Sequence, residues 1–238
     1  MVADDPYRTY FAARSLLMAG DWDTALAVLP RAGVEEAAEL RAQILVERHW
    51  WRLDDPAQAT EAVRALPAAL PHAQLLSGQL AYTRLLFGLD PDDGDEALAE
   101  SAFQAAAVHP TTAGWGAFWM GVLRQNIAQD DAAARPLFDE ALRISRVGEI
   151  PLLESYAVRH LAGLKAEQDR AAAELLFRRS LHLRAALGAR PQTAAAQVTL
   201  AGELPEGDPE RELLLEAARS VTEELDLTWL RRGFDDGS

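Results

Sequence analysis

Apolar residues recur along most of the chain with the spacing of one face of an α-helix, and one such stretch occurs twice. Ile127–Leu142 reads IAQDDAAARPLFDEAL, and Ala166–Leu181 reads AEQDRAAAELLFRRSL. The two copies are offset by 39 residues and match at Asp130/Asp169, Ala134/Ala173, Leu137/Leu176, Phe138/Phe177 and Leu142/Leu181. Self-similarity at this period is typical of stacked helical hairpins, so the sequence predicts an all-α fold.

The same pattern, interrupted by turn residues, predicts helices along the rest of the chain. Beside those of the two copies, we expect helices over residues 7–18, 22–29, 35–53, 56–66, 73–86, 96–108, 115–128, 151–166, 193–203 and 209–225. Asp208 followed by Pro209 has the capping aspartate and first-turn proline of a helix start. Pro136 lies too deep for a first-turn proline, so its helix should either bend or begin late.

A Gly-Asp-aromatic turn followed by spaced small and large apolar residues occurs at Gly20, Asp21, Trp22, Ala25, Leu29 and Ala32. This order resembles the second half of a tetratricopeptide repeat (TPR), where a small residue lets two antiparallel helices approach closely. The corresponding small residues are Ala25, Ala59 or Ala62, Ala97, Ala134 and Ala173, with a weaker candidate near Glu212. The resemblance implies a right-handed α-solenoid of about six TPR-like antiparallel helix pairs over residues 1–232, followed by a flexible tail, 233–238. An irregular helical bundle with the same short loops is the alternative.

The composition indicates an acidic protein encoded in a GC-rich genome. Lys165 is the only lysine against 22 arginines, and Asn126 is the only asparagine. The segments SYAVRHLAGL (Ser155–Leu164) and RSLHLRAALGARP (Arg179–Pro191) resemble actinobacterial TPR-like proteins, a likeness that implies an origin and supplies no reaction. The net charge of −14 argues against binding to nucleic acid and anionic lipid.

Several classes of chemistry are excluded or disfavoured by what the sequence lacks. The chain has no cysteine, which rules out thiol catalysis, disulfides and Cys-ligated metals. Its first residues are not those of a signal peptide, and no apolar run approaches 18 residues, so we expect a cytoplasmic protein that does not span a membrane. No nucleotide-binding, P-loop, GxSxG or kinase motif occurs, and we expect no cofactor.

A metal site is likewise not expected. The acidic loop Asp90–Asp95 invites comparison with a calcium-binding EF-hand loop. However, Gly94 occupies the third acidic position and Ser101 the position of the closing glutamate. The loop is better explained as the acidic start of a helix. The five histidines show no metal-ligand spacing.

The candidate ligand-binding residues lie on the two helices expected over residues 115–128 and 151–166. In TPR arrays the first helix of each pair lines the concave groove, so these two helices should stand side by side there. The candidates are Trp119, Asn126, Tyr156, Arg159 and His160. Core packing is an equal alternative for Trp119, and a hydrogen-bonded structural role is the alternative for His160.

Two functions of different classes follow from these residues. The first is a non-catalytic module that binds a protein or peptide partner in its concave groove, because stacked hairpins make such a groove and no catalytic motif is needed. The second is a small-molecule-binding protein or acid–base enzyme (cyclisation or elimination) with an enclosed pocket around Trp119, Tyr156 and His160. In that enzyme His160 or Tyr156 would carry a proton and Arg159 would hold an anion. Self-association into a homodimer through an apolar end helix is a third possibility.

Overall fold

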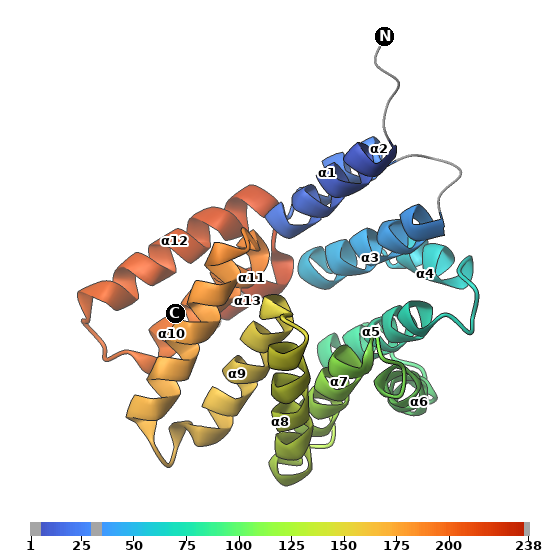
Figure 1. Cartoon of the computed structure of the whole chain (residues 1–238). Coiled ribbons are helices and arrows are strands. Elements are labelled where there is room, and N and C mark those ends of the chain that lie inside the picture. Colours follow the sequence, from blue (N-terminus) through green and yellow to red (C-terminus); the bar gives the residue numbers. More distant parts are fainter. Residues whose placement is uncertain (1–5, 30–34, 236–238) are drawn as a thin grey trace.

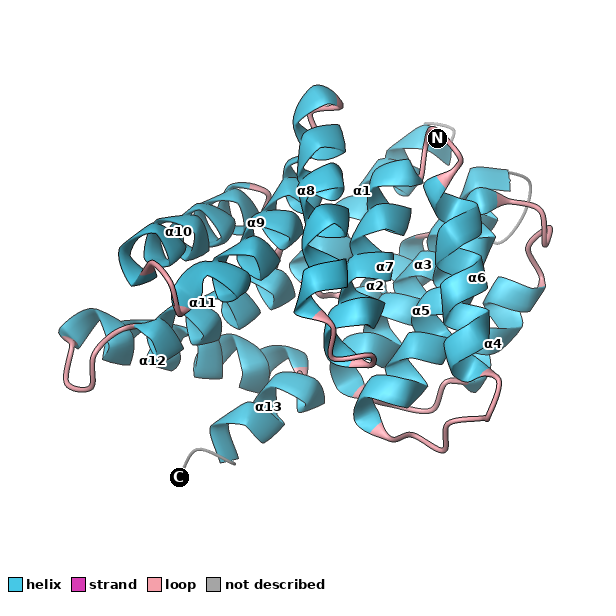
Figure 2. Ribbon diagram, turned by 90° about the horizontal axis from the view of Figure 1, so that it is seen from below, coloured by secondary structure: helices cyan, strands magenta, loops and turns pink. Residues whose placement is uncertain are grey.

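The computed structural model describes residues 6–29 and 35–235, and these residues form thirteen α-helices and no strand (Figures 1 and 2). The helices are α1 (Pro6–Ala19), α2 (Trp22–Val28), α3 (Glu35–Arg52), α4 (Ala57–Arg64), α5 (Pro71–Phe87), α6 (Asp95–Ala107), α7 (Ala113–Asn126), α8 (Asp131–Val147), α9 (Pro151–Ala166), α10 (Arg170–Ala186), α11 (Arg190–Glu203), α12 (Pro209–Leu225) and α13 (Thr228–Asp235). The all-α prediction is confirmed. No helix in the described part of the chain is both long and apolar enough to cross a membrane.

Each odd-numbered helix from α1 to α11 packs against the even-numbered helix that follows it. The helices follow an arc from α1 through α5 and α7 to α12 (Figure 1). The buried apolar residues form four clusters that bridge successive helices, instead of one central core. Packing in neighbouring pairs is therefore shown and is compatible with a helical repeat.

We call the even-numbered helices α2 to α12 the outer helices and the odd-numbered helices α1 to α11 the inner helices. Aspartates begin four of the outer helices, which explains the most regular turns in the sequence. The carboxylates of Asp130 and Asp169 accept hydrogen bonds from the backbone N–H groups of Ala133 (2.9 Å) and Ala172 (3.0 Å). Asp21 caps α2 and Asp208 caps α12 in the same way. A side-chain cap satisfies an N–H group that has no partner within the helix, so these aspartates set where the helices start.

A buried small residue followed four positions later by a larger buried residue recurs in every outer helix. The pairs are Ala25/Leu29, Ala59/Val63, Ala99/Phe103, Ala134/Phe138, Ala173/Phe177 and Ala218/Thr222. The predictions of Ala25, Ala134 and Ala173 agree with this series, and Ala59 is the correct choice over Ala62. The prediction of Ala97 is wrong, because Ala97 is exposed and Ala99 holds the position. In α12 the position belongs to Ala218, since Glu212 is exposed.

Glycines on the inner helices make room for two of these large side chains. A Cβ atom added at Gly78 of α5 would lie 2.6 Å from the ring of Phe103, and one added at Gly121 of α7 would lie 2.6 Å from the ring of Phe138. Both distances are below van der Waals contact, so a larger residue would push the phenylalanine outward. The inner glycine and outer phenylalanine thus fix the close approach of α5 to α6 and of α7 to α8.

Helix boundaries differ from the predicted ones at a few proline and terminal positions. Pro71 is the first residue of α5 instead of part of a connector. The helix that contains Pro136 begins at Asp131, so the late start is wrong. Helix α13 runs through Asp235, which includes the first three residues of the tail expected at 233–238. The remaining three lie outside the described residues.

The two ends of the arc meet, which the hairpin pattern alone does not predict. One apolar cluster joins α1, α2 and α3 to α11, α12 and α13. Within this seam the Arg52 Nε donates to the Leu225 carbonyl oxygen (3.3 Å), and the rings of Trp51 and Trp229 meet edge to face at 5.3 Å. Helix α11 also contacts α1 directly. The arc is therefore closed into a ring, and its concave side becomes an interior.

Candidate functional site

The interior of the ring holds a hollow of about 1690 Å³, which we call the chamber. Its wall comes from the inner helices α1, α3, α5, α7, α9 and α11, with the C-terminal end of α10 and Trp229 of α13. The other outer helices contribute no lining residue. The chamber is larger than the roughly 300–1,000 Å³ usual for drug-sized ligands and remains partly open to solvent.

One side of the chamber is an aromatic wall built from three successive inner helices. Trp50 of α3 stacks on Tyr82 of α5 with ring centroids 5.9 Å apart. Trp119 of α7 meets Trp50 at 5.8 Å and Tyr82 at 5.6 Å, both edge to face. The wall offers flat apolar surface and π-faces, which suit an apolar, aromatic or cationic group of a ligand.

Arg184 of α10 is buried, with 4% of its surface exposed, and lines the chamber together with polar residues of α9 and α11, which we call its polar side. It donates to the Ser155 hydroxyl (3.2 Å) and to the Gln192 carbonyl oxygen (2.9 Å). Its guanidinium lies 4.6 Å above the centre of the Tyr156 ring. Burial lowers the pKa of Arg184 to about 10, so the group is still a cation at neutral pH.

Arg159 of α9 is the second cation of this polar side. It is half-buried on the chamber wall, and burial lowers its pKa. Its positive charge also contributes to lowering the pKa of Arg184, which shows that the two guanidiniums repel each other. Among the described residues, no carboxylate lies within 4.0 Å of either one. Two close cations without an acidic partner form a site that an anion would stabilise.

His160 is a neutral neighbour of this pair. Its ring stacks on Phe138 with centroids 4.7 Å apart, and its Nδ1 lies 2.7 Å from Gln125 Oε1. Because the Gln125 amide nitrogen donates to Asp131 (3.1 Å), its oxygen must face the imidazole, so Nδ1 carries the proton. Nε2 is then an acceptor, 3.4 Å from Arg159 Nη1. Burial, together with Arg159 and Arg184, lowers the pKa of His160 well below its ordinary value.

A carboxyl group, Glu47 of α3, faces this polar side from across the ring. Its Oε1 accepts a hydrogen bond from Gln43 Nε2 (3.1 Å). Burial raises the pKa of Glu47 to about 7, against the effect of the nearby Gln43 and Gln192 side chains, which lower it. Burial also raises the pKa of Tyr156 to about 12, and the charge of Glu47 contributes to that rise. Glu47 and Tyr156 are therefore near enough to interact electrostatically, although they lie on α3 and α9, far apart in the sequence.

All five residues named from the sequence line the chamber: Trp119, Asn126, Tyr156, Arg159 and His160. Trp119 does so while also packing on Phe103 and Phe118, so groove and core are both part of its environment. Asn126 is exposed and donates to the Tyr82 hydroxyl oxygen (2.6 Å). Tyr156, Arg159 and His160 lie together on α9. Whether any of the five binds a ligand stays a prediction.

Sequence reasoning missed Glu47, Trp50, Arg184 and Gln192. Glu47 and Trp50 are one turn apart on α3, so their shared face was readable from the spacing. Arg184 and Gln192 carried no local signal, because they come to the chamber only through the packing of α10 against α9 and of α11 against α10. Their contribution depends on tertiary structure.

The acidic loop before α6 has a structural role. Asp95 is buried and forms a two-bonded ion pair with Arg84, in which one bond, from Arg84 Nε to Asp95 Oδ2, is 2.8 Å long. The arginine lowers the pKa of Asp95. Within the described ranges, no group of three or more histidine or acidic side chains is placed to hold a metal ion.

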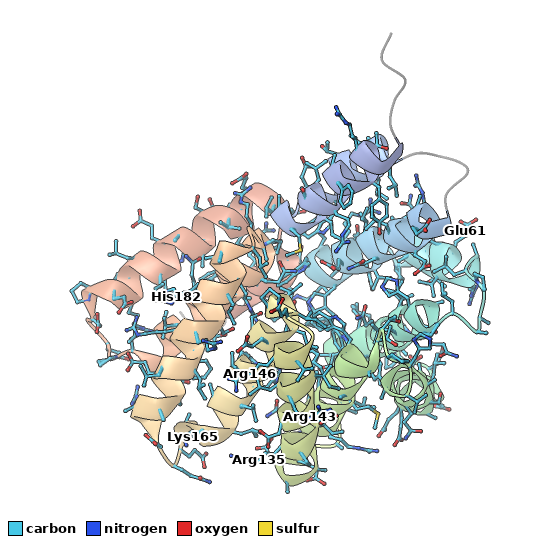
Figure 3. The ribbon with its side chains drawn as sticks, viewed as in Figure 1. Glu61, Arg135, Arg143, Arg146, Lys165 and His182 are labelled. Carbon is cyan, nitrogen blue, oxygen red and sulfur yellow. The ribbon has the colours of Figure 1, made fainter. Side chains whose placement is uncertain are left out.

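Several cations on the outside of the ring are paired with carboxylates, unlike Arg159 and Arg184. Figure 3 labels Arg143 and Arg146 on α8 and Lys165 on α9. Arg143 pairs with Glu140 (2.6 Å), Arg146 with Glu154 (3.2 Å), and Lys165 with Asp169 (3.9 Å). Exposed pairs of this kind contribute little to stability, but they neutralise the outer cations.

No protein-family model, curated protein or solved structure significantly matches the chain. Its function is therefore inferred from the chamber itself.

Proposed function

We propose that this protein is a non-catalytic binding module that holds a small organic anion, with an apolar or aromatic body, in the chamber. The anionic group binds Arg159 and Arg184, and the body of the ligand packs on the aromatic wall of Trp50, Tyr82 and Trp119. This proposal is a form of the small-molecule hypothesis. It retains the predicted binding at the concave face, which is here the inside of a closed ring.

The observation that supports the proposal most strongly is the pair of chamber arginines, Arg159 and Arg184, that lack a carboxylate partner among the described residues. A protein with a net charge of −14 has abundant carboxylates, yet in the described part of the chain none lies within 4.0 Å of these two guanidiniums. Keeping two cations close together in a poorly solvated place costs free energy, and a bound carboxylate or similar anion offsets that cost. Charge-assisted hydrogen bonds of this kind are worth about 1.5–3 kcal/mol each, or about 10–100-fold in affinity.

A protein or peptide partner is the second candidate, because the chamber is larger than a drug-sized ligand requires. In this version the partner inserts a short end segment, and its C-terminal carboxylate meets the arginine pair. Closure of the ring argues against a long peptide lying along an open groove, because the seam between α1–α3 and α11–α13 blocks one end of that groove.

The acid–base enzyme considered as an alternative receives less support. His160 has a lowered pKa, and its Nδ1 is engaged with Gln125, so it is not placed to act as an acid near neutral pH. Glu47, with its pKa of about 7, is the better proton carrier if chemistry occurs.

We also infer that the fold is a right-handed TPR-like solenoid of about six helix pairs, with α13 as an added closing helix. The repeated Ala-x-x-x-large pairs and the aspartate caps of α2, α8, α10 and α12 support this inference.

The test is calorimetric titration of the protein with 3-phenylpropanoate and with its neutral analogue 3-phenylpropanamide. We expect the carboxylate to bind at least about 10-fold more tightly than the amide. Arg159→Gln and Arg184→Gln should each remove most of this preference. Arg135→Gln, an exposed change on α8 (Figure 3), is the matched control and should leave the preference unchanged.

Equal binding of the carboxylate and the amide, or an unchanged preference in both arginine variants, would overturn the proposal. A peptide with a C-terminal phenylalanine, compared with the same peptide as a C-terminal amide, tests the second candidate. If only the free-acid peptide binds and 3-phenylpropanoate does not, a partner's chain end is the ligand.

A further inference from the structure

The chamber wall carries three carboxylates, Glu39, Glu47 and Glu149, and three arginines, Arg14, Arg159 and Arg184. Among these, Glu47 is opposite in sign to Arg159 and Arg184 and is not paired with either of them. Arg184 donates to the Gln192 carbonyl oxygen, and the Gln192 side chain is near enough to Glu47 to lower the pKa of that carboxyl. The two charged groups therefore sit on either side of one residue. Yet no ion pair within 4.0 Å joins Glu47 to Arg159 or Arg184. The wall presents separated opposite charges that do not neutralise each other.

We propose that the chamber takes a small zwitterion, an amino acid or a short peptide with an apolar or aromatic side chain, whose carboxylate binds Arg159 and Arg184 and whose ammonium group binds Glu47. This inference rests on the proposed function, since it assigns the anion site to the carboxylate. It adds a second site of opposite charge and so narrows the class of ligand.

The surroundings of Glu47 suit an ammonium group. The side-chain oxygen Oε1 of Gln192 is buried and has no hydrogen-bond partner among the described residues, and Gln192 itself is only 3% exposed. A buried acceptor without a donor costs free energy that a ligand N–H would recover. The rings of Trp50 and Tyr156 also line the chamber, and aromatic faces attract a cation. Glu47, Gln192 and these rings together provide a charge, an acceptor and a π-surface.

The protonation of Glu47 gives this inference a signature that simple anion binding lacks. With a pKa of about 7, the carboxyl is about half protonated at pH 7. A bound ammonium group would favour the ionised form, so binding should release about half a proton per ligand at that pH. Charged or titratable groups on the wall from the helices around α3 are Arg14 of α1, His72 and Tyr82 of α5, Tyr156, Arg159 and His160 of α9, and Arg184 of α10.

The experiment compares three probes that share one phenylethyl skeleton: L-phenylalanine, 3-phenylpropanoate and 2-phenylethylamine. Calorimetry at pH 7 in two buffers of different ionisation enthalpy gives both the affinity and the number of protons exchanged. We expect L-phenylalanine to bind at least about 10-fold more tightly than either analogue, with release of about half a proton. 3-Phenylpropanoate should release none. The dipeptide Phe-Phe is titrated alongside, and the tighter of the two zwitterions identifies a free amino acid or a short peptide as the ligand.

Glu47→Gln should abolish both the tighter binding of L-phenylalanine and the proton release, while its affinity for 3-phenylpropanoate stays within about 3-fold of the unmodified protein. Glu61→Gln is the matched control, because Glu61 is an exposed glutamate on α4 (Figure 3). If 3-phenylpropanoate binds through the arginines but neither zwitterion binds more tightly or releases protons, the inference is overturned and the proposed function stands. If no carboxylate probe binds, both the inference and the proposed function are contradicted.

Discussion

Replacing Glu47 by glutamine should make the ligand-free protein more stable, and more so at higher pH. The folded chain holds this carboxyl at a pKa of about 7, against an ordinary value of 4.5. Because folding raises this pKa, protonation of the Glu47 carboxyl favours the folded state. This stabilising contribution is complete below pH 4.5 and is lost as the pH rises through 7. From these two values, the penalty in unfolding free energy is about 0.8 kcal/mol at pH 5 and about 3 kcal/mol at pH 8. A glutamine at position 47 carries no ionisable group, so it removes this penalty. Its amide can still hydrogen-bond to Gln43 and Gln192.

The assay is thermal unfolding of the two proteins at pH 5 and pH 8, followed by circular dichroism. For a chain of this length, each kcal/mol corresponds to about 2–4 °C in Tm. The variant should therefore melt about 6–12 °C higher than the unmodified protein at pH 8 and only about 2–3 °C higher at pH 5. Glu61→Gln should change Tm by less than about 2 °C at either pH. A gain that is no larger at pH 8 than at pH 5 would show that the Glu47 carboxyl is not held out of water, and the reasoning would be refuted.

Three further variants test how the ring is held together, each by its shift in denaturant-unfolding free energy. Phe138→Ala removes a fully buried ring between α7 and α8 and should cost about 3–5 kcal/mol; a loss below 1 kcal/mol would contradict this packing. Leu225→Ala empties part of the seam that closes the ring and should cost about 2–5 kcal/mol; if it costs no more than a change at the exposed Leu175, the ends of the arc do not meet in solution. Asp169→Ala removes the cap of α10 and should cost about 1 kcal/mol, whereas Asp169→Asn should cost less; equal losses would mean that capping is not the cause.

The local part of the fold was predictable from the sequence because it depends on local physics. Capping aspartates and first-turn prolines act within one turn, and the predicted helices 151–166 and 209–225 match α9 and α12 to the residue. Ala97 was mistaken for Ala99 because the long turn before α6 shifts the register, and only burial distinguishes two nearby alanines. The eight-residue helix that follows α12 was not predicted.

Closure of the ring could not be predicted, because it depends on small rotations added up over all the hairpins. The contact of Arg52 with Leu225 joins residues 173 positions apart and leaves no trace in either segment. The candidate site likewise has a part that depends on local sequence and a part that depends on tertiary structure. Tyr156, Arg159 and His160 share one helix and were readable from spacing. Their relation to Glu47 exists only once the ring is closed.

The most direct test of the anion site is to locate a bromine-labelled ligand in a crystal structure of the complex. Crystals grown with 3-(4-bromophenyl)propanoate, measured at the bromine absorption edge, would locate the ring of the ligand by its anomalous signal and its carboxylate by the electron density. The account predicts bromine beside Trp50 and Trp119 and the carboxylate on Arg159 and Arg184. Bromine on the outer face of the helices, or a ligand in the chamber with its carboxylate away from both arginines, would contradict it.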